Sequence, residues 1–223
     1  AKRAAALGPT PRVGDPGSNP PDAISGTELA LHEMSSHVWR GGIFVNVSGT
    51  APEFTDYAAD IIARWGEFEG QTLHHGGPES SFKFDVACNW KLAVENFCES
   101  YHLPWIHPGL NSYSRLEDHY HIEKAGKYSG QGTVVYRAPA TGDGRAFPDF
   151  AGLGDIWDSG AEYIALYPNV LLGTHRDHAF AQILEPKTKD RTIEHVEIYY
   201  TSADVTRDRK STRLNSSHDQ ISY

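Results

Sequence analysis

Cysteine and methionine are scarce in this sequence, which holds two cysteines and one methionine among 223 residues. Cys88 and Cys98 are too few for a disulfide framework, and this usage fits a reducing compartment such as the cytoplasm. No apolar run approaches the roughly 20 residues that a membrane-spanning helix needs. No charged-then-apolar leader is seen at the start of the sequence. These absences predict a cytoplasmic protein with no membrane partner.

Positive charge is also in short supply, since 20 lysine and arginine residues stand against 29 aspartate and glutamate residues. The formal charge is −9 and the pI is about 5.7, which argues against nucleic acid as a partner. The glycines form no motif that cradles phosphate, so no nucleotide site is expected. The sequence does hold 39% hydrophobic and 11% aromatic residues, which is enough to build a buried core.

The two ends of the chain differ in character from its middle. Residues 1–27 are rich in proline, glycine and small polar residues, which is typical of a linker or a long loop. Residues 208–223 read DRKSTRLNSSHDQISY, and their back-translation closely resembles a common sequencing adapter. We therefore expect a globular part at 28–207 followed by a non-native tail. Since the first residue is alanine, we also expect natural sequence to be missing at both ends.

Hydrophobic periodicity predicts an α+β fold. Alternating and β-branched residues indicate strands, and turn signals separate the last of them. The expected strands are 37–47 (kinked at its paired glycines), 72–75, 81–87, 132–136, 163–172, 179–184 and 192–200. Spacing typical of amphipathic helices occurs at 52–65 and 89–102, and 141–160 is expected to be a loop. The sum predicts a mostly antiparallel sheet with a long helix that carries the chemistry.

The predicted helix at 89–102 separates apolar from polar side chains. Asn89 is a favourable N-cap residue. At about 100° per residue, one face holds the apolar side chains of Trp90, Ala93, Val94, Phe97 and Tyr101. A stripe on the other side holds Lys91, Glu95, Glu99 and His102. The apolar face is expected to pack on the sheet, which leaves the polar stripe to face water or a ligand.

Three residues of this region form a candidate metal site. Glu99 and His102 are three positions apart, so their side chains are neighbours on a helix. Pro104 should end the helix, and this break lets the loop residue His107 approach His102. Two neutral imidazoles beside a carboxylate suit a divalent metal ion. The spacing alone is also compatible with a polar cluster that holds no metal.

Other polar residues are weaker candidates. His119 and His121 would share one face of a strand, where exposure is the default and a place in a pocket is the alternative. His175, Asp177 and His178 imitate a metal motif but are explained as well by a hairpin turn. The two cysteines are expected to be small buried residues and not nucleophiles.

Residues 89–110 strongly resemble the iron-site segment in the catalytic α subunits of Rieske non-heme iron oxygenases. The matching residues are Asn89-Trp90-Lys91, Glu95-Asn96, Glu99, Tyr101-His102 and His107-Pro108. Residues 38–46 are similar to a strand that follows the Rieske domain in this family, and 167–169 and 185–186 are similar to later strands. The resemblance extends over about 28–200, and the iron-site segment is its most specific part.

This resemblance implies a helix-grip (START-like) catalytic domain with mononuclear Fe(II), which activates O2 to hydroxylate or demethylate a small aromatic or quaternary-amine substrate. His102 and His107 match the two imidazole ligands. Glu99 matches the acidic residue across which the [2Fe–2S] Rieske cluster of a neighbouring subunit delivers electrons. Glutamate at this position is similar to the branch that oxidises quaternary amines. The expected partners are an NAD(P)H-dependent reductase or a ferredoxin, within a homotrimer or an α3β3 assembly.

Two parts of the family's pattern are not found. Neither cysteine begins the Cys-x-His or Cys-x2-His motif that holds a Rieske cluster, so we expect no cluster domain here. The third iron ligand of the family is a carboxylate, usually aspartate, on a late helix. Asp204 follows the last predicted strand too closely for that role, so we expect the ligand to lie beyond the C-terminus. The chain by itself is therefore predicted not to turn over.

Two other functions remain open. Helix-grip domains also carry apolar ligands without a metal, and such a module would bind its ligand unimpaired after His102→Ala. A zinc hydrolase would use Glu99 as a general base beside two histidines and would need neither O2 nor a reductant. The neighbouring Asn-Trp-Lys and Glu-Asn residues favour iron.

Overall fold

The computed structural model describes residues 33–136 and 147–203, in two compact units that divide between Tyr57 and Ala58. The predicted linker, the predicted tail and Asp204 lie outside the described residues. Within those residues, no helix is both long enough and apolar enough to cross a membrane.

The first unit contains a two-stranded hairpin. Strands β1 (Ser35–Trp39) and β2 (Gly42–Asn46) pair antiparallel. Arg40 and Gly41 connect them with φ angles of 47° and 80°, the left-handed backbone that a tight two-residue hairpin turn requires. The prediction of a single kinked strand is therefore wrong, because this turn reverses the chain. The short helix α1 (Phe54–Tyr57) follows.

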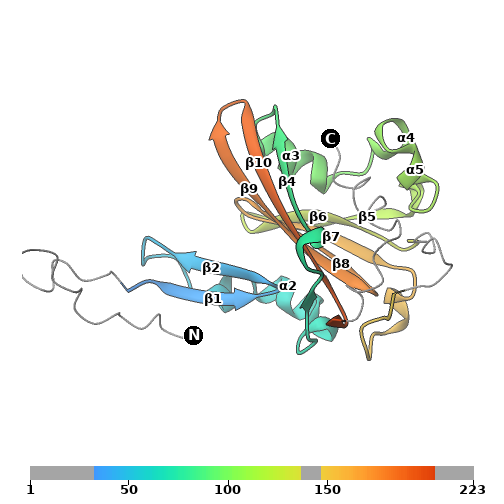
Figure 1. Cartoon of the computed structure of the whole chain (residues 1–223), viewed down its shortest axis with the longest axis horizontal. Coiled ribbons are helices and arrows are strands. Elements are labelled where there is room, and N and C mark those ends of the chain that lie inside the picture. The colour runs from blue at the N-terminus through green and yellow to red at the C-terminus, as the bar shows by residue number, and fades with distance from the viewer. Residues whose placement is uncertain (1–32, 137–146, 204–223) are drawn as a thin grey trace, which may run out of the picture. The chain divides into compact units, whose positions relative to one another are not determined.

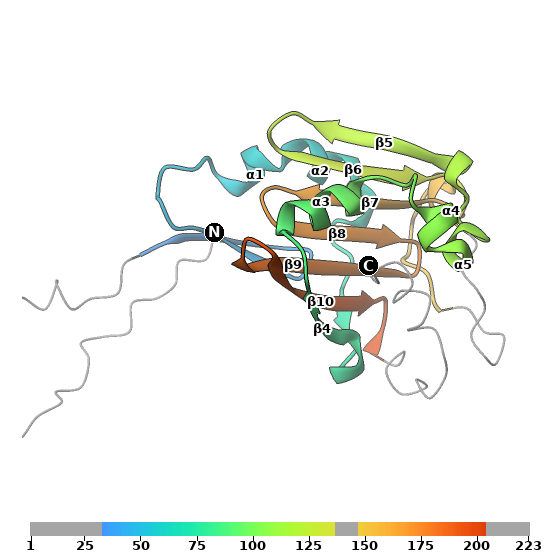
Figure 2. The ribbon, with the colours of Figure 1, turned by 90° about the horizontal axis from the view of Figure 1, so that it is seen from above.

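The second unit is built on one antiparallel sheet of eight strands. Its order is β3-β10-β9-β8-β7-β6-β5, with β4 also paired to β10 (Figure 2). The strands are β3 (His74–His75), β4 (Ser81–Val86), β5 (His119–Lys124), β6 (Tyr128–Thr133), β7 (Ala161–Leu166), β8 (Val170–His175), β9 (His178–Thr188) and β10 (Arg191–Tyr200). The predicted fold class, a mostly antiparallel sheet with few helices, is confirmed.

Some strand boundaries differ from the prediction. The run 163–172 is split into β7 and β8 by a turn around the cis peptide bond Tyr167-Pro168. Strand β6 starts earlier than expected, and β5 was indicated only by the alternation of His119 and His121. The glycines of β6 are unfavourable in strands, so the sequence pattern did not indicate the whole of β6. Gly132 is nevertheless required at its position, because a Cβ atom there would lie 2.3 Å from the ring of Tyr120.

Helices lie on both faces of the sheet (Figure 1). The α-helices of this unit are α2 (Ala59–Arg64), α3 (Trp90–Cys98), α4 (Leu103–Ile106) and α5 (Pro108–Asn111). The 3-10 turns are Gly66–Phe68, Pro78–Ser80, Leu116–Asp118 and Asp155–Trp157. Helices α3, α4 and α5 cover one face, and α2 lies on the other (Figure 1). The predicted helix 52–65 is interrupted at Ala58, and the predicted helix 89–102 ends at Cys98.

The apolar face of α3 packs on the sheet. Residues of the helix and of three strands form a buried cluster, namely Ala93, Val94, Ala165, Leu171 and Leu184. Phe97 extends this packing edge-to-face onto the rings of Tyr163 and Phe180, at 6.1 and 6.2 Å. The predicted docking of this face is confirmed for these residues. Tyr101 is 68% exposed, because the helix has already ended before it.

A buried carboxylate ties α2 to the other face of the sheet. Glu162 on β7 is 2% exposed and accepts two hydrogen bonds from the Arg64 guanidinium, at 2.8 and 2.6 Å. Trp65 Nε1–H and the Tyr120 hydroxyl each donate to the same carboxylate at 2.7 Å. Hydrogen bonding to Glu162 raises the pKa of Arg64, and burial raises the pKa of Tyr120 to about 12. The carboxylate therefore has the partners that a buried charge requires.

Candidate metal centre and pocket

The chain leaves helix α3 where the candidate site begins. At the start of the helix, the Asn89 side chain accepts a hydrogen bond from the Lys91 N–H at 3.1 Å, so the predicted N-cap is confirmed. At its other end Glu99 is extended, with φ −120° and ψ 157°. Pro104 lies in the first turn of α4, where its missing N–H is not needed, so it begins a helix instead of ending one. The prediction of one helix over 89–102 is therefore wrong.

Glu99 and His102 meet all the same. One carboxylate oxygen, Oε1, is hydrogen-bonded to His102 Nδ1, and the other accepts the His102 backbone N–H at 3.2 Å. The contact expected from helical spacing thus arises from a turn in which Glu99 acts like a cap. The two side chains are 22% and 13% exposed, so water screens them only in part. Because the carboxylate occupies Nδ1, Nε2 is the ring atom left to bind a metal ion or a substrate.

His107 lies next to His102. It links α4 and α5, with φ −122° and ψ 60°. The two imidazole ring centres are 5.2 Å apart, and the rings are inclined by 77°. Two imidazoles that bind one ion at about 2 Å each have ring centres roughly 5 Å apart, so this pair fits a shared metal ion.

The donor set consists of two imidazoles and one carboxylate that is hydrogen-bonded to the first of them. A 2-His-1-carboxylate centre binds its metal ion through two imidazoles and one carboxylate. Here two imidazoles lie together, and the Glu99 carboxylate makes the kind of hydrogen bond that orients a ligand imidazole. In the part of the chain that the structure describes, no three His, Cys, Asp or Glu side chains come together as a metal site. The residues present fit two of the three protein ligands. The roles of Glu99, His102 and His107 stay predictions.

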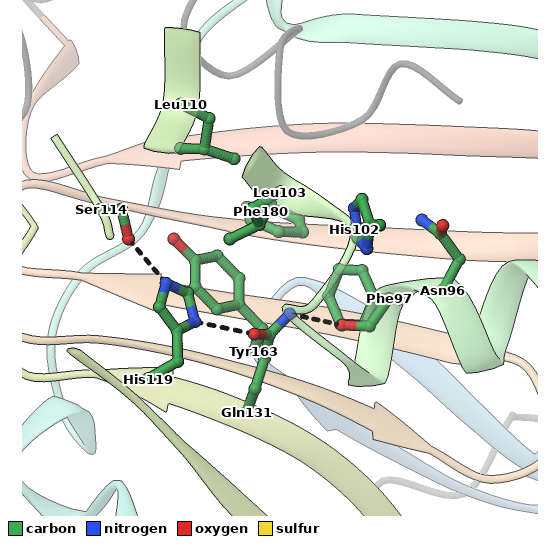
Figure 3. A pocket seen from close by; sticks show the side chains of 10 residues that line it. All are labelled: Asn96, Phe97, His102, Leu103, Leu110, Ser114, His119, Gln131, Tyr163 and Phe180. Carbon is green, nitrogen blue, oxygen red and sulfur yellow. Dashed lines mark hydrogen bonds between the residues drawn. The ribbon is translucent and has the colours of Figure 1, made fainter. Parts of the chain in front are cut away.

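A pocket lies beside His102, between the sheet and the segment from α3 to α5 (Figure 3). Its lining residues are Asn96, Phe97, His102, Leu103, Leu110, Ser114, His119, Gln131, Tyr163 and Phe180. Apolar and aromatic side chains form one part of the wall, and hydroxyl, amide and imidazole groups form the other. No carboxylate of the described residues lines it, so the walls offer aromatic faces and neutral hydrogen-bonding groups.

His119, expected at the surface by default, lines the pocket. Its Nε2 lies 3.0 Å from Ser114 Oγ, and its Nδ1 lies 2.8 Å from Gln131 Oε1. Burial lowers the pKa of His119, so the ring is neutral at pH 7. His121 keeps the expected exposure, with its side chain beside Glu123. Gln131 was missed altogether, although a long polar residue between two glycines of a strand could have marked it.

The remaining candidates have structural roles. His175, Asp177 and His178 lie at the β8–β9 turn, so the hairpin explanation is confirmed. The rings of His175 and His178 stack with centres 4.1 Å apart, and Asp177 Oδ1 lies 2.7 Å from His178 Nδ1. Burial holds the pKa of His175 well below its usual value. Cys88 and Cys98 are only partly buried, so the prediction of buried cysteines is wrong, although burial still raises the pKa of Cys98 to about 11, as for a poor nucleophile.

Glu194 on β10 is a buried carboxyl that no hydrogen bond supports. Its side chain is fully buried, and neither of its oxygens has a hydrogen-bond partner among the described residues. Burial raises the pKa of Glu194 from 4.5 to about 7. Between pH 4.5 and pH 7, the Glu194 carboxyl is deprotonated in the unfolded chain but still protonated in the folded chain. The free energy of unfolding therefore falls as the pH rises from 4.5 to 7, and it stays reduced above pH 7.

Glu194→Gln should therefore stabilise the fold in alkaline solution and leave it almost unchanged in acid. The expected gain is on the order of 2 kcal/mol near pH 8 and below ~0.5 kcal/mol near pH 4.5. Urea unfolding at both pH values measures the difference in free energy of unfolding. A gain of the same size at both pH values would show that packing, and not ionisation, produces the effect.

Comparison with known proteins identifies related sequences and a matching family model. The family model for the ring hydroxylating alpha subunit (catalytic domain) matches residues 62–221. The chain is 26% identical to putrescine 2-hydroxylase of Ralstonia nicotianae over 182 residues, which cover 77% of the chain and 46% of that protein. It is 22% identical to the carnitine monooxygenase oxygenase subunit of Acinetobacter baumannii over 182 residues, which cover 77% and 44%. The chain thus spans about half the length of the curated relatives it matches.

Solved structures share the fold. The quaternary ammonium Rieske monooxygenase CntA, in complex with an inhibitor, matches with a TM-score of 0.66 at 16% identity, over 90% of this chain and 52% of that chain. Naphthalene 1,2-dioxygenase with indole in its active site matches with a TM-score of 0.64 at 17% identity, over 83% of this chain and 48% of that chain. The expected catalytic-domain fold of Rieske oxygenases is confirmed by these matches.

Proposed function

The chain belongs to the family of ring-hydroxylating α subunits, whose catalytic domain it matches, and we propose that it is the mononuclear-iron portion of a Rieske-type oxygenase. The parent protein uses O2 at Fe(II) to hydroxylate or demethylate a small organic substrate. The observation that carries the proposal is the Glu99 carboxylate bonded to His102, with the His107 ring centre 5.2 Å from that of His102. A carrier of apolar ligands does not need an imidazole pair backed by a carboxylate.

Three side chains have roles in this proposal. His102 and His107 would hold the iron, which supplies the chemistry of O2 activation when it is bound. Glu99 accepts the Nδ1 proton of His102, which turns Nε2 towards the ion and makes the imidazole a better donor. The carboxylate is 22% exposed, so it can also accept a hydrogen bond from a cluster-bound histidine of a neighbouring subunit. Electrons would cross to the iron through this carboxylate.

Of the two substrate classes, aromatic compounds and quaternary amines, we favour an amine. The names of the curated relatives specify putrescine and carnitine, which both carry a cationic nitrogen. Glutamate at position 99 is similar to the amine-oxidising branch of the family. The aromatic side chains of Phe97, Tyr163 and Phe180 in the pocket wall can attract such a cation through their ring faces.

The rest of the parent protein lies outside this chain in the proposal. A Rieske [2Fe–2S] domain precedes residues 28–207, and the third iron-binding carboxylate follows them. An NAD(P)H-dependent reductase or a ferredoxin supplies electrons to a homotrimer or an α3β3 assembly in the cytoplasm. The coverage of about half of each curated relative supports this division.

Expression of the complete reading frame from the source DNA tests the proposal. The frame should encode Cys-x-His and Cys-x2-His motifs upstream and an aspartate-bearing helix downstream. With a reductase, the full-length protein should consume NAD(P)H and O2 in step with a small amine, and much more slowly with naphthalene. Turnover with zinc and without O2 would point to a hydrolase. A complete frame without either cluster motif would rule out the oxygenase.

A further inference from the structure

Gln131 on β6 bridges the sheet and the end of helix α3. Its side-chain Nε2 donates two hydrogen bonds, to the carbonyl oxygen of Phe97 at 3.0 Å and to that of Glu99 at 2.9 Å (Figure 3 shows the first). The Phe97 carbonyl is among the last of α3, which have no partner within the helix. Gln131 thus supplies the hydrogen bonds that hold the helix end and the Glu99 peptide to the sheet.

These two bonds determine the state of His119. Because both amide hydrogens of Gln131 are used, its Oε1 is an acceptor, and the facing Nδ1 of His119 at 2.8 Å carries the proton. In the neutral ring Nε2 is then an acceptor, and the Ser114 hydroxyl donates to it across 3.0 Å (Figure 3). The polar chain from Ser114 through His119 to Gln131 has one direction and ends on the backbone of Glu99.

The other end of this polar chain reaches the segment that bears His107. The backbone N–H of Ser114 donates to Leu110 O at 2.9 Å, and that of Asn111 donates to His107 O at 2.9 Å. Ser114 is in this way tied to helix α5, which begins directly after His107. Both histidine-bearing segments are therefore attached to the neighbouring strands β5 and β6.

We infer that Gln131 is a positioning residue that sets the mutual placement of His102 and His107. It anchors the Glu99 peptide directly, and it anchors helix α5 through His119 and Ser114. The inference rests on the proposed function, in which His102 and His107 bind iron. It adds a residue that does not itself bind the metal ion. Glutamine suits this task because it donates twice and accepts once, whereas glutamate cannot donate when ionised and methionine does neither.

Gln131→Met tests the inference, because it keeps the length of the side chain and removes its strong hydrogen bonds. Gln182→Met on β9 is the matched control, since Gln182 is 1% exposed and its Nε2 has no hydrogen-bond partner in the part of the chain that the structure describes. The first readout is proton–nitrogen NMR of the imidazoles without metal, in which the His102 Nδ1 proton held by Glu99 gives a downfield signal. The second is titration with Co(II), whose visible spectrum reports coordination geometry.

We expect Gln131→Met to lose the His102 signal and to weaken Co(II) binding by about 10- to 100-fold, as for other residues that orient a ligand. Gln182→Met should change neither. Gln131→Glu should behave like Gln131→Met, because it restores only the acceptor. Ser114→Ala removes the hydrogen bond from Ser114 to His119. It should shift the Co(II) spectrum in the same direction as Gln131→Met does, by a smaller amount. This variant keeps the test decisive if Gln131→Met does not fold.

The outcomes separate this inference from the proposed function. The positioning role is overturned if Gln131→Met leaves both the His102 signal and the Co(II) spectrum unchanged, whatever happens to the melting temperature. If Gln131→Met does not fold, an unchanged Co(II) spectrum in Ser114→Ala overturns it. If the wild-type chain binds no Co(II) and Gln131→Met still loses the His102 signal, the positioning role stands and the proposed iron site fails.

Discussion

His102→Ala should abolish stoichiometric binding of Fe(II) to the chain. His102 supplies one of two imidazoles whose ring centres are 5.2 Å apart, and a single remaining imidazole cannot hold the ion by itself. Loss of a residue that merely orients a ligand weakens metal binding by about 10- to 100-fold, so loss of the ligand itself should exceed about 100-fold. Anaerobic equilibrium dialysis with Fe(II) measures the dissociation constant.

His121→Ala is the matched control for this substitution. His121 lies on β5, and its side chain is 56% exposed beside Glu123, so its removal should leave Fe(II) binding unchanged. Glu99→Gln should fall between the two, because the amide still accepts a hydrogen bond but no longer polarises the imidazole. Retention of full Fe(II) affinity in His102→Ala would refute the proposed site, and an equal loss in His121→Ala would indicate nonspecific binding.

Glu162→Ala should reduce the free energy of unfolding by about 3 kcal/mol or more. The substitution leaves the buried Trp65 Nε1–H and the Tyr120 hydroxyl without their acceptor and removes both hydrogen bonds from Arg64. Removal of one partner from a buried ionic network is strongly destabilising, because the remaining groups stay desolvated. Urea unfolding, followed by tryptophan fluorescence and by circular dichroism, measures this loss.

Asp85→Ala provides the comparison for an exposed ion pair. Asp85 and Arg191 form two hydrogen bonds, but their side chains are 52% and 56% exposed, so the expected loss of stability is much smaller than for Glu162→Ala. Glu162→Gln should lie between the two, since its amide oxygen accepts fewer of the hydrogen bonds. Similar losses in Asp85→Ala and Glu162→Ala would mean that the Glu162 network does not anchor α2.

Local sequence signals located helix α3 correctly but not its end. Asn89 caps the helix as its side-chain chemistry predicts, and Ala93, Val94 and Phe97 pack where helical spacing puts them. The helix stops at Cys98, although no proline or glycine marks that position. Gln131, more than thirty positions away, donates the hydrogen bonds that the carbonyl groups at the helix end accept, and no local pattern indicates a partner so distant.

The same limit applies to the pocket. His119 and Gln131 come from strands β5 and β6, of which the first was indicated only by the alternation of His119 and His121 and the second was predicted to start at 132. Gly130 and Gly132 in β6 resemble a loop in sequence, because glycine is disfavoured in strands unless another group approaches closely. The approaching group at Gly132 is the ring of Tyr120, and only the pairing of the two strands brings it there.

Residue types and their order predicted the antiparallel fold class, the family through the resemblance of residues 89–110, and the closeness of Glu99, His102 and His107. The folded chain decided where α3 ends, how the two imidazoles come to lie 5.2 Å apart, and which neutral groups line the pocket beside them. These features depend on hydrogen bonds between segments that are distant in sequence, such as those from Gln131 to the carbonyl groups of Phe97 and Glu99. Such contacts exist only once the sheet has formed, since the sheet is what brings their partners within reach.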